Sequence, residues 1–146
     1  MSVSVAIKNQ IKSKIQSCPS VQVVYGYEEV NPSGWPAVML TPGDMNGEFS
    51  SNTQNSLIYT YKVQILFTLG QDMETPKRLN RLEYAENTIC TVIDEIITAV
   101  DNNFELEGSP VLFVNASDVS WGYVSGEFGE ARSAEITLSV YTEITI

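Results

Sequence analysis

Histidine is absent from this sequence of 146 residues. Because histidine is the commonest general base and a frequent zinc ligand, its absence excludes Ser-His and Cys-His nucleophile pairs and every histidine-containing zinc site. The sequence has only 2 cysteines, Cys18 and Cys90, and they form no CxxC pair. Such a low count excludes a disulfide framework and gives no support to a metal or redox site. A reduced, intracellular setting is therefore expected.

Basic residues are scarce as well, with 8 Lys and Arg against 18 Asp and Glu and a formal net charge of -10. A chain of this charge is not expected to bind phosphate backbones or anionic lipid. Apolar residues nowhere run uninterrupted for the ~18 positions that a membrane-spanning helix needs. Lysines also interrupt the apolar residues near the N-terminus, which argues against a signal peptide. We expect protein partners and no association with a membrane.

Sequence motifs for catalysis are also missing. The chain contains neither the phosphate-binding P-loop pattern nor the dinucleotide pattern GxGxxG, and it lacks the nucleophile-elbow pattern GxSxG. Acidic pairs such as Glu28 with Glu29 have the chemistry for acid-base catalysis or for binding a hard cation. In so acidic a chain, however, such pairs are expected on solvated surfaces. We predict that the protein is not an enzyme and has no catalytic, metal-binding or cofactor-binding residues.

The composition is that of a folded protein. Hydrophobic residues make up 43% of the chain and charged residues 18%, unlike the balance found in disordered chains. A chain of 146 residues corresponds to about one domain, and it shows no internal repeat or domain boundary. We therefore expect a single domain over residues 1–146, with Trp35 and Trp121 among its core aromatic residues.

Two segments have helical periodicity. An apolar residue recurs every four positions from Val3 to Ile15, and Pro19 is expected to end this first helix. The second helix is predicted over residues 75–101, with Thr75 as N-cap, a proline in the first turn, and apolar residues at spacings of three, four or seven. Both helices therefore have an apolar face to bury.

The rest of the chain has strand signals. The clearest strand covers residues 55–70, where every second residue from Leu57 to Leu69 is apolar. This alternation favours an antiparallel sheet with one covered face and one wetter face. Further strands are predicted over residues 21–30, 37–40, 111–114, 119–125 and 134–144. We predict an α+β fold with a single mixed or antiparallel β-sheet and two helices packed on one face.

A polar segment from Asp44 to Ser56 separates two of these strands. It consists mostly of Asn, Ser, Gly, Thr and Gln, and it is longer than the loops that compact domains usually keep without a function. Asp44, Met45 and Phe49 are therefore candidate partner-binding residues, with the two apolar side chains as contact anchors. Alternatively, "GEFSS" pairs as a short strand and places Phe49 against the core.

The charges of the second helix oppose its dipole. The basic residues Lys77, Arg78 and Arg81 lie near its N-terminus, whereas Asp94, Glu95 and Asp101 lie towards its C-terminus. Each charge at the unfavourable end of the helix loses roughly 0.3–1 kcal/mol of charge–dipole stabilisation at low salt. One interpretation is an interface in which this basic end meets an acidic surface of a neighbour. The other is a helix that is held by its apolar face and tolerates its charges.

Several local patterns together resemble a known family. A strand leading to "GWPAVMLTP", a polar segment with "GEF", and the strand "NSLIYTYKVQILF", placed between two helices and before terminal strands, resemble the tail terminator (tail completion) proteins of long-tailed bacteriophages. The resemblance implies a structural virion protein of the tail or neck, assembled in the host cytoplasm. It implies a hexameric ring that caps the tail tube protein, stops its polymerisation and joins the head connector protein. An acidic ring also suits DNA that only passes through, because like charges repel.

Two alternatives remain open at this stage. The first is a head completion or stopper protein, which forms part of the connector in the same kind of virion. The second, of a different class, is an acidic DNA-mimic inhibitor. A mimic needs acidic residues clustered on one face, whereas these are spread along the sequence from Glu28 to Glu143.

Overall fold

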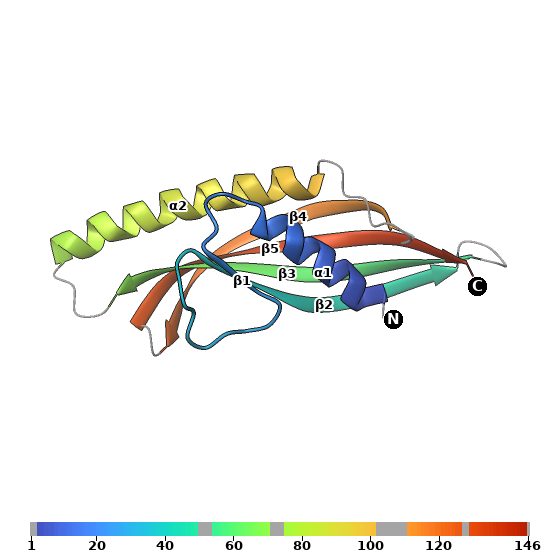
Figure 1. Cartoon of the computed structure of the whole chain (residues 1–146), viewed down its shortest axis with the longest axis horizontal. Coiled ribbons are helices and arrows are strands. Elements are labelled where there is room, and N and C mark those ends of the chain that lie inside the picture. The colour runs from blue at the N-terminus through green and yellow to red at the C-terminus, as the bar shows by residue number, and fades with distance from the viewer. Residues whose placement is uncertain (1–2, 50–53, 71–74, 102–110, 127–128, 146) are drawn as a thin grey trace.

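The structure, a computed structural model, is described here for residues 3–49, 54–70, 75–101, 111–126 and 129–145. The elements follow the order α1 (Val3–Gln16), β1 (Val23–Tyr25), β2 (Ala37–Phe49), β3 (Gln54–Gly70), α2 (Thr75–Asp101), β4 (Val111–Gly126) and β5 (Gly129–Thr145). The strands form a 5-stranded sheet in the order β1-β2-β3-β5-β4. Strands β1 and β2 are parallel, whereas the other neighbours are antiparallel. Both helices lie on one face of this mixed sheet (Figure 1), which confirms the predicted α+β fold class.

The centre of the sheet is the pairing of β3 with β5. Tyr61 pairs with Leu138 and Val63 with Ile136, and all four side chains are buried beneath the helices. Alternate residues point to the same face, so the apolar set predicted on β3 forms one wall of the core. The periodicity of this strand was therefore sufficient to identify the covered face.

The helices bury the stripes that their periodicity predicts. Ile7, Ile11 and Ile15 of α1 are fully buried, and Ile89 and Ile96 of α2 are as well. The hydroxyl of Tyr61 donates a hydrogen bond to the Ser4 carbonyl oxygen at 2.7 Å, which fixes α1 over β3. Helix α2 begins at Thr75 and ends at Asp101, as predicted.

The prediction of a polar loop between Asp44 and Ser56 is wrong. Strand β2 continues past the predicted end at Leu40 to Phe49, and β3 begins at Gln54. The pairing shifts register between Pro42 and Met45, so Gly43 and Asp44 form a bulge opposite Thr60. Polar residues are accommodated because the long neighbouring strand supplies backbone hydrogen-bond partners, whatever the side chains.

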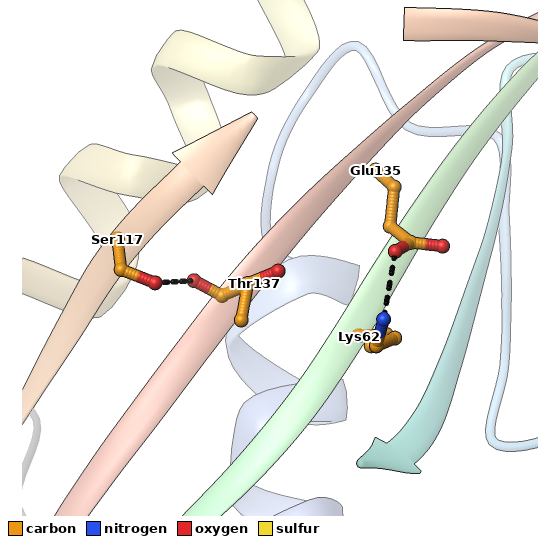
Figure 2. Close-up of polar contacts among 4 residues, drawn as sticks. All are labelled: Lys62, Ser117, Glu135 and Thr137. Atoms are coloured by element: carbon orange, nitrogen blue, oxygen red, sulfur yellow. Dashed lines mark hydrogen bonds and ion pairs between the residues drawn. The ribbon is translucent and has the colours of Figure 1, made fainter. Parts of the chain in front are cut away.

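The prediction of two strands at residues 111–114 and 119–125 is also wrong, since both belong to β4. A register shift between Ala116 and Asp118 absorbs the polar residues that had suggested a break. At this shift the Ser117 hydroxyl donates to the Thr137 carbonyl oxygen at 3.3 Å (Figure 2). The side chain thus satisfies a backbone acceptor where the regular pairing is disturbed.

The face of the sheet opposite the helices is only partly covered. Met39, Leu66 and Ala131 form a small buried cluster there, against which Tyr25 and Trp35 pack. Beyond this cluster the face is polar, as shown by the ion pair of Lys62 with Glu135 at 3.3 Å (Figure 2). Both side chains are well exposed, so this pair contributes little to stability.

Candidate functional site

Among the described residues, the groups able to carry out chemistry are not gathered in one place. Within the part of the chain that the structure describes, no set of three or more Cys, Asp or Glu residues is arranged to hold a metal ion. None of the described helical residues form a stretch long and apolar enough to cross a membrane. Cys18 is buried and Cys90 is exposed, and both are free thiols. Burial, together with the nearby Glu95 charge, raises the pKa of the Cys18 thiol.

A shallow hollow of about 230 Å³ lies on the face of the sheet away from the helices. Glu28 and Glu29 line it together with apolar side chains that include Met39, Leu66 and Val124. Its lining contains no titratable groups other than these two carboxylates. Two carboxylates against an apolar floor do not define a reaction or a ligand.

The basic end of α2 is only partly free for a partner. The Arg81 Nε donates to the Thr68 carbonyl oxygen of β3 at 3.1 Å. Its guanidinium also lies 5.9 Å from the centre of the Phe67 ring. Arg81 therefore helps to attach the start of α2 to its own sheet. The hydrogen bond to Thr68 offsets the unfavourable interaction of the Arg81 charge with the helix dipole. Lys77 and Arg78 lie on the same helix, and their side chains are outside the described residues.

The candidates in the polar segment lie on β2. Asp44 is exposed and lies within the bulge that follows Pro42. Met45 is paired with Tyr59, and Phe49 with Asn55 near the end of the hairpin. The side chains of Met45 and Phe49 are outside the described residues, so their role as contact anchors stays a prediction.

The acidic part of α2 has a structural explanation that the sequence did not reveal. Both carboxylate oxygens of Glu95 accept hydrogen bonds from Ser20, one from the backbone N–H at 3.0 Å and one from the hydroxyl at 2.5 Å. Glu95 thereby attaches the segment after α1 to α2. Its neighbour Asp94 is exposed. Part of the reversed charge pattern of α2 is therefore explained by contacts within the chain.

The most distinctive surface group was missed by sequence reasoning, which placed Trp121 in the core. Trp121 is 40% exposed and Tyr123 is 53% exposed, and both lie on the helix-bearing side of β4. The guanidinium carbon of Arg132 lies 4.9 Å from the Trp121 ring centre and 4.5 Å from that of Tyr123. We name these three residues the aromatic-arginine cluster. Its sequence signal is the spacing W-x-Y on one strand, which places both rings on one face.

Arg132 is held firmly in this cluster. Its Nε donates to the Glu86 carboxylate of α2 at 3.0 Å, and its Nη1 donates to the Gly122 carbonyl oxygen at 2.9 Å. The Arg132 side chain is only 15% exposed. The rings of Trp121 and Tyr123 therefore pack against a planar cation that is already fixed in place. Because these side chains are already ordered, a partner that binds them would lose little conformational entropy.

Comparison with known proteins identifies a fold and no sequence family. No protein-family model matches the chain, and no curated protein matches it. Among solved structures, the chain is similar to one chain of a structure titled "Virion of native gene transfer agent (GTA) particle", with a TM-score of 0.55 and 11% identity. The match covers 97% of this chain and 94% of that chain. The likeness therefore shows a shared fold over nearly the whole of both chains.

Proposed function

We propose that this chain is a structural protein of a phage-like virion and acts there as a tail terminator. In this role six copies form a ring that caps the tail tube, ends its polymerisation and joins it to the head connector. The chain is then located in the tail or neck of the particle, and DNA only passes through the ring. The proposal assigns no catalytic step and no cofactor.

The observation that carries the proposal is the fold match to a chain of a virion. It spans 97% of this chain and 94% of that one, so neither has a large element that the other lacks. The resemblance of local sequence patterns to tail terminators supports the finer assignment. The fold match supports the virion class, and the local sequence patterns support the terminator role within it.

The distribution of charge supports the same reading. Exposed or half-exposed acidic residues occur on the β1–β2 connection, α2, β4 and β5, with Glu29, Asp94, Asp118 and Glu135 as examples. A DNA mimic needs its acidic residues densely arranged on one face, and this wide spread disfavours it. A general negative charge instead repels DNA from the surfaces that it passes.

The proposal is tested by the assembly and binding of the purified chain. Light scattering should give the mass of a closed ring, six copies by the proposal, and electron microscopy should show a ring with a central opening. The ring should bind a tail tube protein from the same virion. Binding to the connector protein with none to the tube protein would instead indicate a stopper. A chain that binds neither would contradict a virion-joining role.

A further inference from the structure

The charges of this chain are unevenly divided between its two helices. Residues 1–27, which include α1, contain Lys8, Lys12 and Lys14 and no Asp or Glu. Residues 82–101, which form most of α2, contain no Lys or Arg. Their acidic residues are Glu83, Glu86, Asp94, Glu95 and Asp101. Helix α1 is therefore basic, whereas α2 is acidic beyond its first turns.

Lys8 and Lys12 lie next to each other on one side of α1. The Lys8 ammonium donates one long hydrogen bond, at 3.4 Å, to the Gly26 carbonyl oxygen just after β1. The Lys12 side chain also lies beside Gly26. Among the described residues, neither lysine forms an ion pair. Acidic residues outnumber basic ones by 18 to 8 in this chain, so two lysines without a carboxylate partner are available to a neighbouring molecule.

A matching pair of carboxylates lies on α2. Glu83 is exposed and has no basic partner within the described part of the chain. Glu86, three residues later, is partly exposed and accepts the hydrogen bond from Arg132. The aromatic-arginine cluster therefore lies next to these carboxylates, with the rings of Trp121 and Tyr123 about half exposed.

The two surfaces match in charge and in apolar content. Residues three or four positions apart on a helix are neighbours, so the two carboxylates are spaced like the two lysines. Val5, about one turn before Lys8, is 46% exposed and adds an apolar group to the α1 surface. Trp121 and Tyr123 add apolar groups beside the carboxylates, and residues of these types are enriched at binding hot spots. Apolar contact with opposite charges around it is typical of specific protein interfaces.

The two surfaces lie on opposite sides of the layer of helices. Helix α1 is nearest to β1 and β2, whereas α2 lies along β3, β5 and β4 (Figure 1). Lys8 reaches the end of β1, and Glu86 reaches Arg132 of β5, so the lysines and carboxylates do not meet within one chain. Copies placed side by side bring α1 of one copy next to α2 of the next.

We propose that the basic flank of α1, formed by Val5, Lys8 and Lys12, binds the α2 surface of a second copy. This acidic flank consists of Glu83, Glu86 and the rings of Trp121 and Tyr123. The inference rests on the proposed ring, because a contact between two different surfaces repeats from copy to copy and can close as a ring. Duplex DNA also attracts lysines, but two lysines on a chain of net charge -10 give it little attraction. The complementary flanks of the chain itself favour a second copy.

Charge reversal of each flank tests the contact. Lys8→Glu/Lys12→Glu and Glu83→Lys/Asn87→Lys should each raise the protein concentration needed for half-assembly at least ~10-fold, because attraction becomes repulsion. Asn87 is exposed, and this choice leaves the ion pair of Glu86 in place. Lys8→Arg/Lys12→Arg keeps the charge and should stay within about twofold of the wild type. Circular dichroism confirms folding of every variant.

Mixing the two charge-reversed chains tests which surfaces meet. Each chain alone has two flanks of like charge, whereas every contact in an alternating mixture joins opposite charges again. The equimolar mixture should therefore recover assembly, with the mass of the wild-type ring by light scattering. Folded variants that assemble normally alone, or that fail to assemble when mixed, would overturn the proposal. A dimer in place of a ring would do the same, as would a wild-type chain that is monomeric at its highest soluble concentration.

The remaining outcomes separate this contact from DNA binding and from the proposed function. Unchanged assembly of Lys8→Glu/Lys12→Glu, together with lost binding to duplex DNA, would assign the lysines to DNA and overturn the proposal. If rings depend on both flanks but do not affect tail tubes, the contact stands and the terminator function fails. If rings cap tubes but ignore both charge reversals, the function stands and the contact fails.

Discussion

Glu95 should stabilise the fold although its charge opposes the dipole of α2. Its carboxylate accepts hydrogen bonds from the Ser20 backbone N–H and hydroxyl at 3.0 and 2.5 Å, in a partly buried site. Hydrogen bonds to a charged group contribute about 1.5–3 kcal/mol each when buried, and less with partial exposure. The dipole penalty is confined to the last turn, and Glu95 precedes Asp101 by more than one turn. The hydrogen bonds therefore dominate.

The substitution Glu95→Gln should lower the free energy of unfolding by about 1–2 kcal/mol, because it removes the charge from both hydrogen bonds. Asp94→Asn is a matched control, since it removes the same charge from an exposed neighbour. It should change the free energy by less than about 0.5 kcal/mol. Urea denaturation at one fixed protein concentration measures both, because assembly also shifts apparent stability.

A double-mutant cycle of Glu95→Gln with Ser20→Ala tests the cause. The coupling energy should be about 1 kcal/mol, because the two substitutions share a hydrogen bond. Equal effects of Glu95→Gln and Asp94→Asn would show that only the net charge of α2 matters. A coupling energy near zero would show that the contact with Ser20 does not stabilise the fold. Either result would refute the reasoning.

Further predictions concern a tyrosine, the thiols and the basic end of α2. Tyr61→Phe should cost about 1 kcal/mol by removing the hydrogen bond to Ser4. Because burial raises the pKa of Tyr61 above its unfolded value of about 10, wild-type stability should fall as pH rises past 10, and less so in Tyr61→Phe when measured by urea denaturation. A thiol reagent should label exposed Cys90 at once and buried Cys18 only on unfolding, and rapid labelling of both would contradict the packing of α1. Arg81→Glu should lower the unfolding free energy by about 1–2 kcal/mol through loss of the bond to Thr68, whereas Arg78→Glu should weaken binding to partners without lowering the melting temperature.

Much of the fold could be predicted because it follows from local periodicity. The alternation from Leu57 to Leu69 identified the covered face of β3, and the cap at Thr75 located the start of α2. These signals arise within one element, so they need no knowledge of neighbours. Strand ends were harder, because the extension of β2 to Phe49 depends on pairing with β3, a long-range contact. Polar residues at such positions look like loop residues until the partner strand is known.

The candidate site was less predictable for the same reason. Trp121 looked like a core residue because large aromatic residues usually are, yet β4 lies at the edge of the sheet and leaves the ring 40% exposed. Arg132 joins it only through the register of β4 with β5. The charges of α2 suggested an interface, and the structure also gives Arg81 and Glu95 contacts within the chain that the sequence did not reveal. Partner contacts remain predictions for all six candidates: Asp44, Met45, Phe49, Lys77, Arg78 and Arg81.

The most direct test of the proposed function is the length of tail tubes assembled in the presence of this chain. A tail tube protein from the same virion would be polymerised alone and with this chain, and tube lengths would be measured by electron microscopy. The account predicts long tubes of uncontrolled length with the tube protein alone. It predicts shorter tubes with a ring at one end when the chain is added. Tubes of unchanged length without such a ring, at concentrations where the chain is assembled, would contradict a terminator function.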